Sequence, residues 1–393
     1  MTLNTHSSQH VVVIGGGILG ISVATELAIR GTPVTLLEAA RIGAGTTSTS
    51  YAWVNANGKE PESYFRLNQA GLDAHRSLAT PQTPWIAATG HLEIAEDEAH
   101  ERDLRARAER MTSRGYAVEE LTSAQAQRLE PGIIVPPSAK TIVFFPDEAH
   151  VYPHLYVAER LVQFQAHGGI LREGARVTGI DRSGSPLNVL LADGSHIEAD
   201  RVVLATGRWT GPLAASLGLD VPMAAHTAPG DVTVGHLVRT APTPARLHRL
   251  VTTPWLNVRP EGGGRLLIQA LDLDVSASPE AAESDRASLV PEYLSRLRTI
   301  LHGTESLETA EILVGQRAMP IDGRTIAGPA PEAPDIYVVA THSGVTLAPF
   351  LGRAVAREVQ GDIEPLLEDF RLTRFAEGVP VDLPRGPRKP GEQ

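Results

Sequence analysis

The chain of 393 residues lacks cysteine entirely, and only 5% of its residues are aromatic. Without a thiol it can form neither a disulfide nor a thiolate metal site, and it cannot use a cysteine nucleophile. Basic residues are outnumbered, because 35 Lys and Arg stand against 46 Asp and Glu and give a formal net charge of −11. With no run of Lys or Arg, nucleic acid is not expected as a partner.

Long apolar runs are scarce as well. The most hydrophobic stretch, residues 11–29, contains Glu26 and the glycines Gly15 and Gly17, which a membrane-spanning helix would disfavour. The leader MTLNTHSSQH lacks the charged and apolar regions of a signal peptide. We therefore expect a cytoplasmic protein without a membrane span. His150 and His154 lie four residues apart, but Pro153 breaks any helix between them, so no metal site is predicted.

A glycine-rich turn stands near the N-terminus, in HVVVIGGGILGISVATELAIRGTPVTLLEAA (residues 10–40). Residues 11–14 are uncharged and mostly β-branched, which is typical of a buried parallel strand. Gly15, Gly17 and Gly20 follow with the spacing G-x-G-x-x-G. The first allows a tight turn, the second lets a pyrophosphate approach the backbone, and the third lets the helix pack on the strand.

The rest of this stretch completes a dinucleotide-binding pattern. Apolar residues at helical spacing predict a helix over 18–30, ended by Gly31, and a second strand over 34–37. Glu38 then follows the glycines at the ~20-residue spacing expected for a carboxylate on a ribose hydroxyl. The free N–H groups and dipole at the helix start favour a bound diphosphate.

Further segments alternate between helix and strand. Helices are predicted over residues 60–80, 96–114, 153–167 and 288–302, and a strand over 175–180. Asp193-Gly194 predicts one hairpin, and Gly262–Gly264 predicts a second within WLNVRPEGGGRLLIQAL. DIYVVATHSGVTLAPFLGRAVAREV predicts a strand, a turn and a helix near the C-terminus. One nucleotide domain interrupted by a second domain would explain this order.

Several separated segments together resemble the D-amino-acid oxidase superfamily of FAD-dependent oxidoreductases, which includes the glycine oxidase and sarcosine oxidase types. The resemblance covers residues 11–375 and is carried by VVVIGGGILGISVATELAIRG, LLEAARIGAGTTSTS, TGHLEIA, DEAHVYPHLYVAERLVQFQAHGGILREGARVTGI, ADRVVLATGRWT, GQRAMPIDGRTIAGP and DIYVVATHSGVTLAPFLGRAVA. It implies an α/β (α+β) fold, with a Rossmann-like FAD-binding domain and an inserted antiparallel-sheet substrate domain. The implied division is 1–80, 150–215 and 315–365 for the FAD domain, 81–149 and 216–314 for the substrate domain, and 366–393 for a tail.

The resemblance also assigns residues to the cofactor. The glycine-rich fingerprint would hold the diphosphate, and Glu38 would bind the adenosine ribose. The 45–50 loop would lie beside the diphosphate and flavin. The turn before the last helix would face the pyrimidine edge of the flavin. The cofactor-binding residues implied are Gly15, Gly17, Ile18, Leu19, Gly20, Glu38, Ala39, Gly45, Thr46, Thr47, Ser48, Val177, Ala205, Thr206, Gly207, Gly344, Val345 and Thr346. Some relatives attach the flavin through Cys or His, but this chain has no Cys and TTSTSYAWVNAN has no His. We expect non-covalent FAD.

The resemblance gives two candidate catalytic residues. Arg317, in GQRAMPIDG, matches an arginine that binds the substrate carboxylate in glycine oxidase, and a guanidinium suits that planar partner. The alternative is an arginine paired with a structural acid. His342 flanks the flavin-facing turn and would contact flavin or substrate, or else pack structurally. Thr346 or Leu347 stands near the place of a lysine in sarcosine oxidases, which argues against a sarcosine substrate. Arg259, Trp255 and His226 could line the pocket.

Three functions remain open at this level. The first is an amine or amino-acid oxidase that forms an imine and passes electrons to molecular oxygen, giving hydrogen peroxide. The second is a dehydrogenase of an amino or hydroxy acid with a quinone or protein acceptor. The third is an aromatic hydroxylase or a non-catalytic flavoprotein, but VVATHSG lacks the Gly-Asp pair of the hydroxylases. Neither the substrate nor the oligomeric state follows from the sequence.

Overall fold

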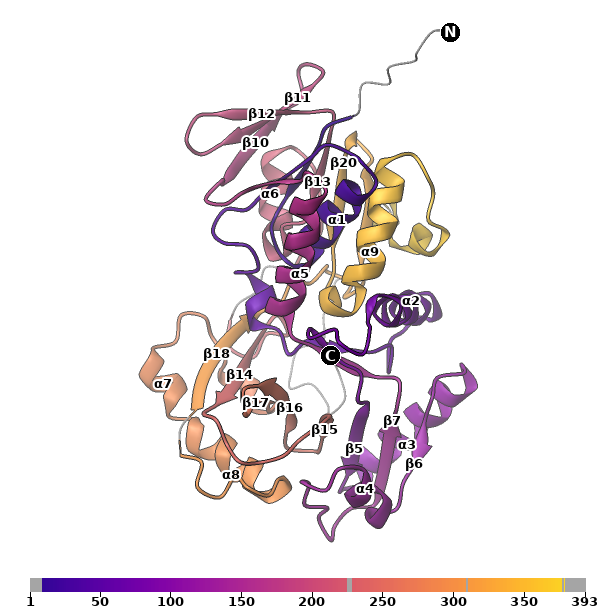
Figure 1. The fold of residues 1–393 in the computed structure, drawn as a ribbon, viewed down its shortest axis with the longest axis vertical. Coiled ribbons are helices and arrows are strands. Elements are labelled where there is room, and N and C mark those ends of the chain that lie inside the picture. The colour runs from indigo at the N-terminus through magenta and orange to yellow at the C-terminus, as the bar shows by residue number, and fades with distance from the viewer. Residues whose placement is uncertain (1–8, 225–227, 309, 377, 379–393) are drawn as a thin grey trace.

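The computed structural model describes residues 9–224, 228–308, 310–376 and 378. Within these ranges the strands form a six-stranded sheet, an eight-stranded sheet and two sheets of three strands. Figure 1 shows the six-stranded sheet and its helices in the upper half of the molecule and the eight-stranded sheet in the lower half. His226, the leader before residue 9 and most of the predicted tail lie outside the described residues.

The six-stranded sheet has the order β19-β20-β13-β1-β2-β9. Its strands are β1 (Val11–Ile14), β2 (Val34–Leu37), β9 (Ile170–Arg172), β13 (Arg201–Leu204), β19 (Ile326–Ala330) and β20 (Ala333–Ala340). All are parallel to their neighbours except β19, which pairs antiparallel with β20. Every residue of β1 is buried, as the uncharged β-branched run predicts for a strand covered on both faces.

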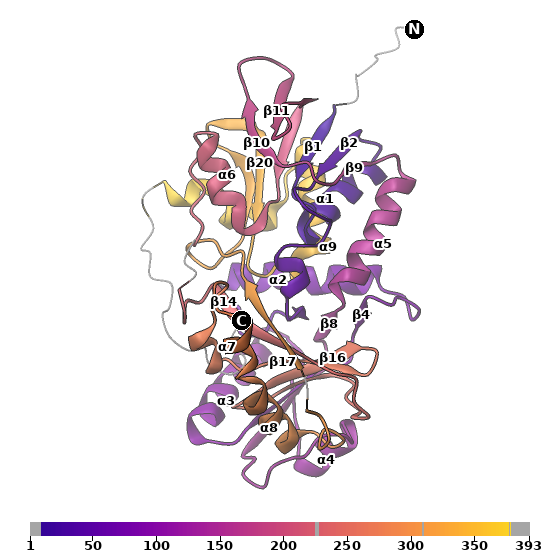
Figure 2. The same ribbon diagram turned by 90° about the vertical axis from the view of Figure 1, so that its left-hand side faces the viewer.

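Helices cover one face of this sheet. They are α1 (Ile18–Ile29), α5 (Pro153–Ala166) and α9 (Gly344–Val359), with α2 (Glu62–Leu78) packed on α9. Figure 2 shows α1, α5 and α9 beside the strands from a second direction. A Cβ atom added to Gly352 of α9 would lie 3.0 Å from Ser22 of α1, so the absence of a side chain lets these two helices approach closely. A Cβ added to Gly344, the first residue of α9, would lie 3.9 Å from the Ile18 side chain, so the glycine-rich turn lies next to the start of α9.

The other face carries a three-stranded sheet and a short helix. The sheet consists of β10 (Val177–Asp181), β11 (Leu187–Leu191) and β12 (His196–Ala199), and α6 (Thr210–Ser216) packs with it in one hydrophobic cluster. The hairpin predicted at Asp193-Gly194 is confirmed, because β11 and β12 pair antiparallel around it and Gly194 has φ of 86°. Val177, one of the predicted cofactor-binding residues, begins β10.

The eight-stranded sheet has the order β18-β14-β17-β16-β15-β5-β7-β6. Its strands are β5 (His91–Ala95), β6 (Glu119–Glu120), β7 (Thr141–Phe145), β14 (Val234–Thr240), β15 (Leu250–Thr252), β16 (Asn257–Gly262), β17 (Arg265–Gln269) and β18 (Ala310–Gln316). The predicted β16–β17 hairpin is confirmed, and all three glycines of its turn have positive φ. Helices α3 (Glu98–Ser113), α4 (Ser123–Leu129), α7 (Glu283–Ala287) and α8 (Val290–Ile300) surround it.

The two faces of this sheet differ in character. One face packs Val258, Ile268 and their neighbours against α8 in an apolar cluster. On the other face, Thr252 stands opposite both Asn257 and Glu93, and residues two positions along a strand point the same way. This polar face comprises buried side chains from four strands: His91, Glu93, Thr252, Asn257, Arg259 and Gln269. A buried sheet face with so many polar groups differs from a normal core face.

A small sheet connects the two large ones. It contains β3 (Trp53–Val54), β4 (Ile86–Ala87) and β8 (Ala149–Val151). On one side the Trp53 ring contacts the His91 ring of the polar face, with centroids 4.4 Å apart. On the other side the Trp53 carbonyl accepts a hydrogen bond from Thr346 of α9 at 3.2 Å. The chain between residues 50 and 57 is thus held between the nucleotide-binding half and the polar face.

Packed structure continues past the predicted end of the FAD domain at residue 365. Two short 3-10 helices, Pro365–Phe370 and Leu372–Phe375, follow α9. Leu367 and Phe370 are completely buried, and Arg371 forms an ion pair with Glu358. Residues 366–376 are therefore held against the body of the protein by these side chains. The division into domains stays a prediction.

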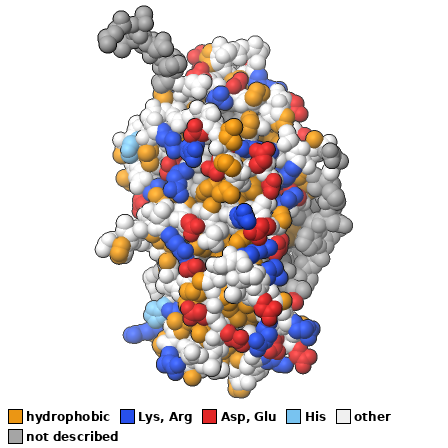
Figure 3. Space-filling view, turned by 90° about the vertical axis from the view of Figure 1, so that its right-hand side faces the viewer, with side chains coloured by type: hydrophobic (Ala, Val, Ile, Leu, Met, Phe, Trp, Pro, Cys, Tyr) orange, Lys and Arg blue, Asp and Glu red, His pale blue; other side chains and the backbone are white. Residues whose placement is uncertain are grey.

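Two further features concern the charge of the surface and the character of the described helices. Figure 3 shows basic and acidic side chains interspersed over one face, with hydrophobic side chains between them. Among the described residues, no helix combines the length and the apolar character needed to cross a bilayer.

Candidate functional site

Two glycines of the fingerprint are required by packing. Gly15 has φ of 105°, and an added Cβ would lie 2.5 Å from the carbonyl oxygen of Ala205. A Cβ on Gly20 would lie 1.7 Å from the Gly15 carbonyl oxygen. Larger residues would therefore force the β1–α1 turn away from β13. The same contacts bring the Ala205 segment against the fingerprint.

Gly17 is different, because its backbone is in an ordinary extended conformation with φ of −70°. The nearest atom to an added Cβ is Thr47 Oγ1, at 3.3 Å. This hydroxyl accepts a hydrogen bond from the Ile18 N–H at 3.0 Å. The 3-10 turn Thr46–Thr49 thus lies over the start of α1, and Gly15 and Gly17 remain partly exposed beside it. Leu19, by contrast, is buried inside the helix.

Glu38 lies at the end of β2 with its carboxylate held in place. Its Oε2 accepts a hydrogen bond from the Gly16 N–H at 2.8 Å, and its Oε1 accepts one from the Ala40 N–H at 2.8 Å. Ala39 is exposed beside it. The Ala175 N–H donates to the Glu38 carbonyl at 2.9 Å, so the segment leading to Val177 adjoins this carboxylate. The structure therefore brings these predicted adenosine-side residues together.

Three further predicted segments converge beyond the fingerprint. A Cβ on Gly45 would lie 3.2 Å from the Trp209 ring, which follows Thr206 and Gly207 in the chain. Thr46 Oγ1 donates to the Gln316 carbonyl at 2.7 Å, and Gly207 adjoins Ala318. The Ser48 hydroxyl, in contrast, donates within its own loop to the Ala44 carbonyl. The 45–48 loop, the 205–207 turn and the end of β18 therefore meet at one place.

The start of α9 completes the arrangement. Gly344 is partly exposed and adjoins the Ile18 side chain, and the Ser343 hydroxyl lies 2.9 Å from the Tyr64 hydroxyl. His75 Nε2 is 2.8 Å from the Val345 carbonyl oxygen, and burial lowers the pKa of His75 to about 4. His75 is thus neutral at pH 7 and donates from Nε2. The free N–H groups of this 16-residue helix give a positive potential next to the fingerprint.

Comparison with known proteins places this arrangement in a family. The model of the family described as FAD dependent oxidoreductase matches residues 10–358. The chain belongs to this family of FAD-dependent oxidoreductases. Glycine oxidase from Geobacillus kaustophilus is 26% identical over 390 residues, which cover 95% of this chain and 98% of that protein.

Solved structures support the same fold. The crystal structure of glycine oxidase from Geobacillus kaustophilus superposes with a TM-score of 0.81 at 23% identity, and covers 93% of this chain and 99% of the other. The structure of L-proline dehydrogenase from P. horikoshii has a TM-score of 0.78 at 20% identity, with coverage of 94% and 98%. The predicted mixed α/β fold with a Rossmann-like FAD-binding half is confirmed.

The observed residues fit FAD. Gly17 leaves a cradle that a side chain would fill, in front of the N–H groups that start α1. Backbone donors at such a turn suit the diphosphate, and the fixed Glu38 carboxylate suits ribose hydroxyls. Glu38 would hold the adenosine end, the Gly15–Gly17 and Thr46–Thr47 backbone the diphosphate, and Gly344–Thr346 the pyrimidine edge.

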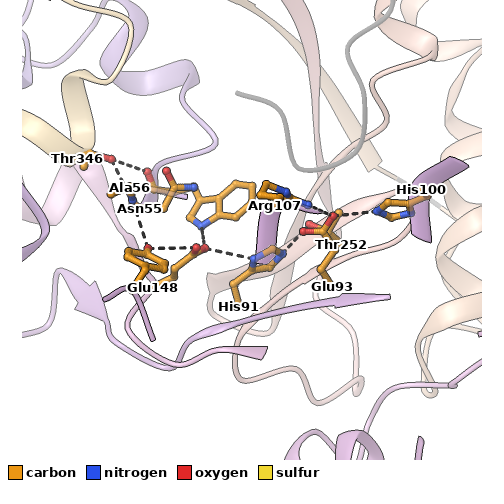
Figure 4. A network of polar contacts seen from close by, with 11 residues as sticks. Asn55, Ala56, His91, Glu93, His100, Arg107, Glu148, Thr252 and Thr346 are labelled. Atoms are coloured by element: carbon orange, nitrogen blue, oxygen red, sulfur yellow. Dashed lines mark hydrogen bonds and ion pairs between the residues drawn. The ribbon is translucent and has the colours of Figure 1, made fainter. Parts of the chain in front are cut away.

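A buried polar network runs from α9 to the polar face (Figure 4). Thr346 Oγ1 contacts Trp53 and Asn55, and the Trp53 indole donates to Glu148 Oε2 at 2.6 Å. The Tyr116 hydroxyl donates to the other oxygen of Glu148 at 3.2 Å, and His91 Nδ1 lies 3.2 Å from Oε2. His91 Nε2 continues to Thr252 at 2.9 Å. Glu148 therefore fixes the Trp53 ring between α9 and the large sheet.

A second carboxylate is buried farther along the polar face (Figure 4). Glu93 contacts Arg107 and lies 2.9 Å from His100 Nε2. Burial alone would raise the pKa of Glu93, but Arg107 and His100 hold this pKa at about 2. Glu93 is therefore ionised, and its charge is compensated inside the protein.

Arg317 lies just after β18, and its guanidinium is engaged by protein groups. Nη1 donates to the carbonyl of Val232, at 2.7 Å, and to that of Val234. Nη2 lies 3.5 Å from Asp274 Oδ2. This geometry corresponds to the structural alternative stated for Arg317, and its role as a carboxylate anchor stays a prediction. Asp274 lies 43 residues earlier in the chain, which is why the pairing could not be read from the motif.

The other candidates lie in distinct surroundings. His342 is partly buried at the turn before α9, next to the predicted flavin edge. Trp255 is 56% exposed and lies outside the buried polar face, whereas Arg259 is completely buried within it.

Sequence reasoning missed Glu148, Trp53 and His91. A signal was present in YAWVNAN, because the odd-numbered residues carry the large polar or aromatic side chains and the even-numbered ones are small or apolar.

Buried polar atoms without partners concentrate in this region. Among the described residues, both amide atoms of Asn55 and Asn57, the Tyr51 hydroxyl and Arg259 Nη2 have no hydrogen-bond partner. Leaving one such group unpaired costs about 1–3 kcal/mol. Proteins usually pair buried polar groups with protein atoms or water, so these groups keep a hydrogen-bonding capacity that the described residues do not use.

Proposed function

We propose that this protein is an oxidase of amines or amino acids that uses FAD bound non-covalently. The substrate C–N single bond becomes an imine by loss of a hydride from carbon and a proton from nitrogen, which together are two electrons and two protons. Molecular oxygen accepts these two electrons and two protons and yields hydrogen peroxide. The observation that carries the proposal is the convergence of the fingerprint, the Thr46–Thr49 turn and the start of α9 opposite a buried polar face. The similarity to glycine oxidase over 95% of the chain supports the substrate class.

The protein's contribution is to hold and orient the substrate. FAD, when bound, supplies the two-electron chemistry at its flavin ring. The start of α9 provides a positive potential that stabilises negative charge on a neighbouring group. Trp53 is only 5% exposed and is fixed by Glu148, so it places a buried aromatic ring between the start of α9 and the polar face. Positioning of the substrate carbon at such a site supplies much of the rate enhancement.

His342 is proposed to contact the flavin or the substrate. It is partly buried at the turn that leads into Gly344–Thr346. Arg317 stays the carboxylate anchor implied by the family resemblance, on the condition that its present partners release it. The proposed location of the protein is the cytoplasm.

The experiment compares electron acceptors and substrates directly. Purified holoenzyme is mixed with a panel of amino acids, N-alkyl amino acids and hydroxy acids, and oxygen uptake and peroxide are measured together. We expect one peroxide for each amine oxidised. Oxidation of amino acids only with an added quinone, or oxidation of hydroxy acids alone, would move the assignment to the dehydrogenase alternative.

A further inference from the structure

One face of α2 presents polar and small residues to the start of α9. This stripe consists of four buried residues at spacings of three or four: Tyr64, Asn68, Gly71 and His75. The face that a helix buries in a protein core is usually apolar, so a polar stripe needs polar partners. Figure 1 shows α2 beside the lower end of α9, where the turn of residues 343–346 begins that helix. The stripe therefore meets the turn that the family resemblance places at the flavin.

This turn is held from two sides. On the side of α2, the Tyr64 hydroxyl lies 2.9 Å from the Ser343 hydroxyl. A Cβ added to Gly71 would lie 2.6 Å from the Thr346 carbonyl oxygen, so the two helices approach as closely as a glycine permits. On the other side, the Thr346 hydroxyl donates to the Trp53 carbonyl at 3.2 Å. The start of α9 is thus fixed by contacts from segments that are distant in the chain.

Pro349 leaves one carbonyl of this turn without its helical donor. In an α-helix each carbonyl accepts a hydrogen bond from the N–H four residues later, and proline has no N–H. Pro349 lies inside α9, four residues after Val345. His75 Nε2 is 2.8 Å from the Val345 carbonyl oxygen and donates to it, because a carbonyl can only accept. His75 therefore supplies from α2 the hydrogen bond that α9 cannot form by itself.

The surroundings of His75 keep this hydrogen bond in one arrangement. The side chain is only 1% exposed, and its ring contacts the rings of Trp85 and Tyr156, with centroids 5.6 Å and 6.1 Å away. His75 Nδ1 is buried and has no partner among the described residues, so the single proton of the neutral ring belongs on Nε2. The direction of the ring and the position of its proton are thus both fixed.

We propose that His75 is a positioning residue, which replaces the hydrogen bond removed by Pro349 and thereby fixes the turn of residues 343–346 against the flavin. The inference rests on the proposed place of the flavin beside residues 344–346. Free N–H groups at a helix start stabilise negative charge on a neighbouring group, whereas a carbonyl oxygen turned toward that group repels it. His75 holds the Val345 carbonyl toward α2 and so away from the flavin. It should therefore favour the reduced flavin over the oxidised one.

The first measurement is the midpoint potential of FAD in the holoenzyme, determined by reduction together with a reference dye. His75→Leu removes the donor at similar size, and His75→Gln keeps an N–H donor at similar reach. Loss of this hydrogen bond should lower the affinity for reduced relative to oxidised FAD by about twofold to tenfold in His75→Leu. A tenfold change corresponds to a potential lower by ~30 mV for two electrons. His75→Gln should recover most of the wild-type potential.

A second substitution makes the test specific to the Val345 carbonyl. Pro349→Ala restores an N–H four residues after Val345, so the helix itself can then supply the missing hydrogen bond. In the Pro349→Ala background, His75→Leu should change the affinity ratio by less than about twofold. If His75 acted only by filling space, its replacement would have the same effect with and without Pro349.

Amide hydrogen exchange of the full chain gives a readout that needs neither turnover nor flavin. The amides of residues 343–348 should exchange about twofold to tenfold faster in His75→Leu and near the wild-type rate in the double variant with Pro349→Ala. Ser77→Ala is the matched control on α2, because it removes a hydroxyl that donates to the Ala74 carbonyl at 2.9 Å. It should leave both the exchange and the potential unchanged.

Three results would each overturn the proposal. They are an unchanged potential in His75→Leu, an equal effect of His75→Leu with and without Pro349, and a loss in His75→Gln as large as in His75→Leu. If His75→Leu alone does not fold or does not retain FAD, recovery in the double variant is the same rescue. A double variant that fails although Pro349→Ala is intact would also overturn the proposal. Rescue of the potential by Pro349→Ala in a holoenzyme that no amine reduces would refute only the proposed function.

Discussion

Replacement of Gly17 by valine should remove FAD without unfolding the protein. Gly17 precedes α1 in an extended conformation with φ of −70°, which any residue adopts. An added Cβ would be 3.3 Å from Thr47 Oγ1, a contact relieved by a small movement of that side chain. The two methyl carbons extend about 1.5 Å farther and would occupy the space before the N–H groups of α1.

The magnitude follows from the donors that would be blocked. If two charge-assisted hydrogen bonds to the diphosphate are lost at about 1.5–3 kcal/mol each, FAD affinity falls by more than about a hundredfold. The fold itself should lose only about 1 kcal/mol, the usual cost of an apolar residue at the start of a helix. Gly15→Val differs, because Gly15 has φ of 105° and an added Cβ lies 2.5 Å from Ala205, so that variant should fail to fold.

The assay measures flavin content and stability separately. The flavin-to-protein ratio comes from absorbance, the dissociation constant from FAD fluorescence, and stability from urea unfolding of the protein without FAD. Gly184→Val is the matched control, because the nearest atom to its added Cβ is 4.0 Å away in a loop far along the chain. A folded Gly17→Val protein that binds FAD within threefold of wild type would refute the proposed diphosphate site.

Two further predictions concern cofactor attachment and pH. Acid precipitation should release intact FAD into the supernatant, because the chain has no Cys and no His within TTSTSYAWVNAN; flavin that stays with the pellet would refute non-covalent binding. His75 should reduce stability in mild acid. Its pKa is about 4 when folded and 6.5 as a free group, so between these values only the unfolded chain binds the proton. Stability should therefore fall with decreasing pH below 6.5, by up to roughly 1.4 kcal/mol per pH unit from this group. Urea unfolding of His75→Gln should show a shallower decrease than wild type between pH 6.5 and 4.5, and parallel curves would contradict the assignment.

Local pattern was enough to predict the nucleotide-binding half. The β1–α1–β2 unit, Glu38 and both glycine-bearing hairpins depend on residues near one another in the chain, where spacing alone carries the information. The packing of Leu367 and Phe370 could not be read from the sequence, because their partners lie in α2 and β19, which are distant in the chain. A short apolar pair after a helix gives no periodic signal of its own.

The polar half of the site depends on long-range pairing. The Glu148 side chain binds Trp53, 95 residues earlier, and Arg259 binds the Tyr51 carbonyl across 208 residues. These contacts arise from the register of the large sheet and from the small sheet that packs on it. The partners of Arg317 could not be predicted for the same reason, because they are distant in the sequence. The motif around Arg317 predicts a carboxylate ligand, whereas the fold brings Asp274 beside it.

The most direct test of the central claim is an anaerobic titration of the purified flavoprotein. A panel of amino acids and N-alkyl amino acids is added without oxygen, and the visible absorption of the flavin is followed, with the corresponding hydroxy acids as the comparison. The account predicts that at least one amino acid bleaches the flavin fully and that oxygen restores the colour with formation of hydrogen peroxide. Bleaching by a hydroxy acid, with every amine leaving the flavin oxidised, would contradict it.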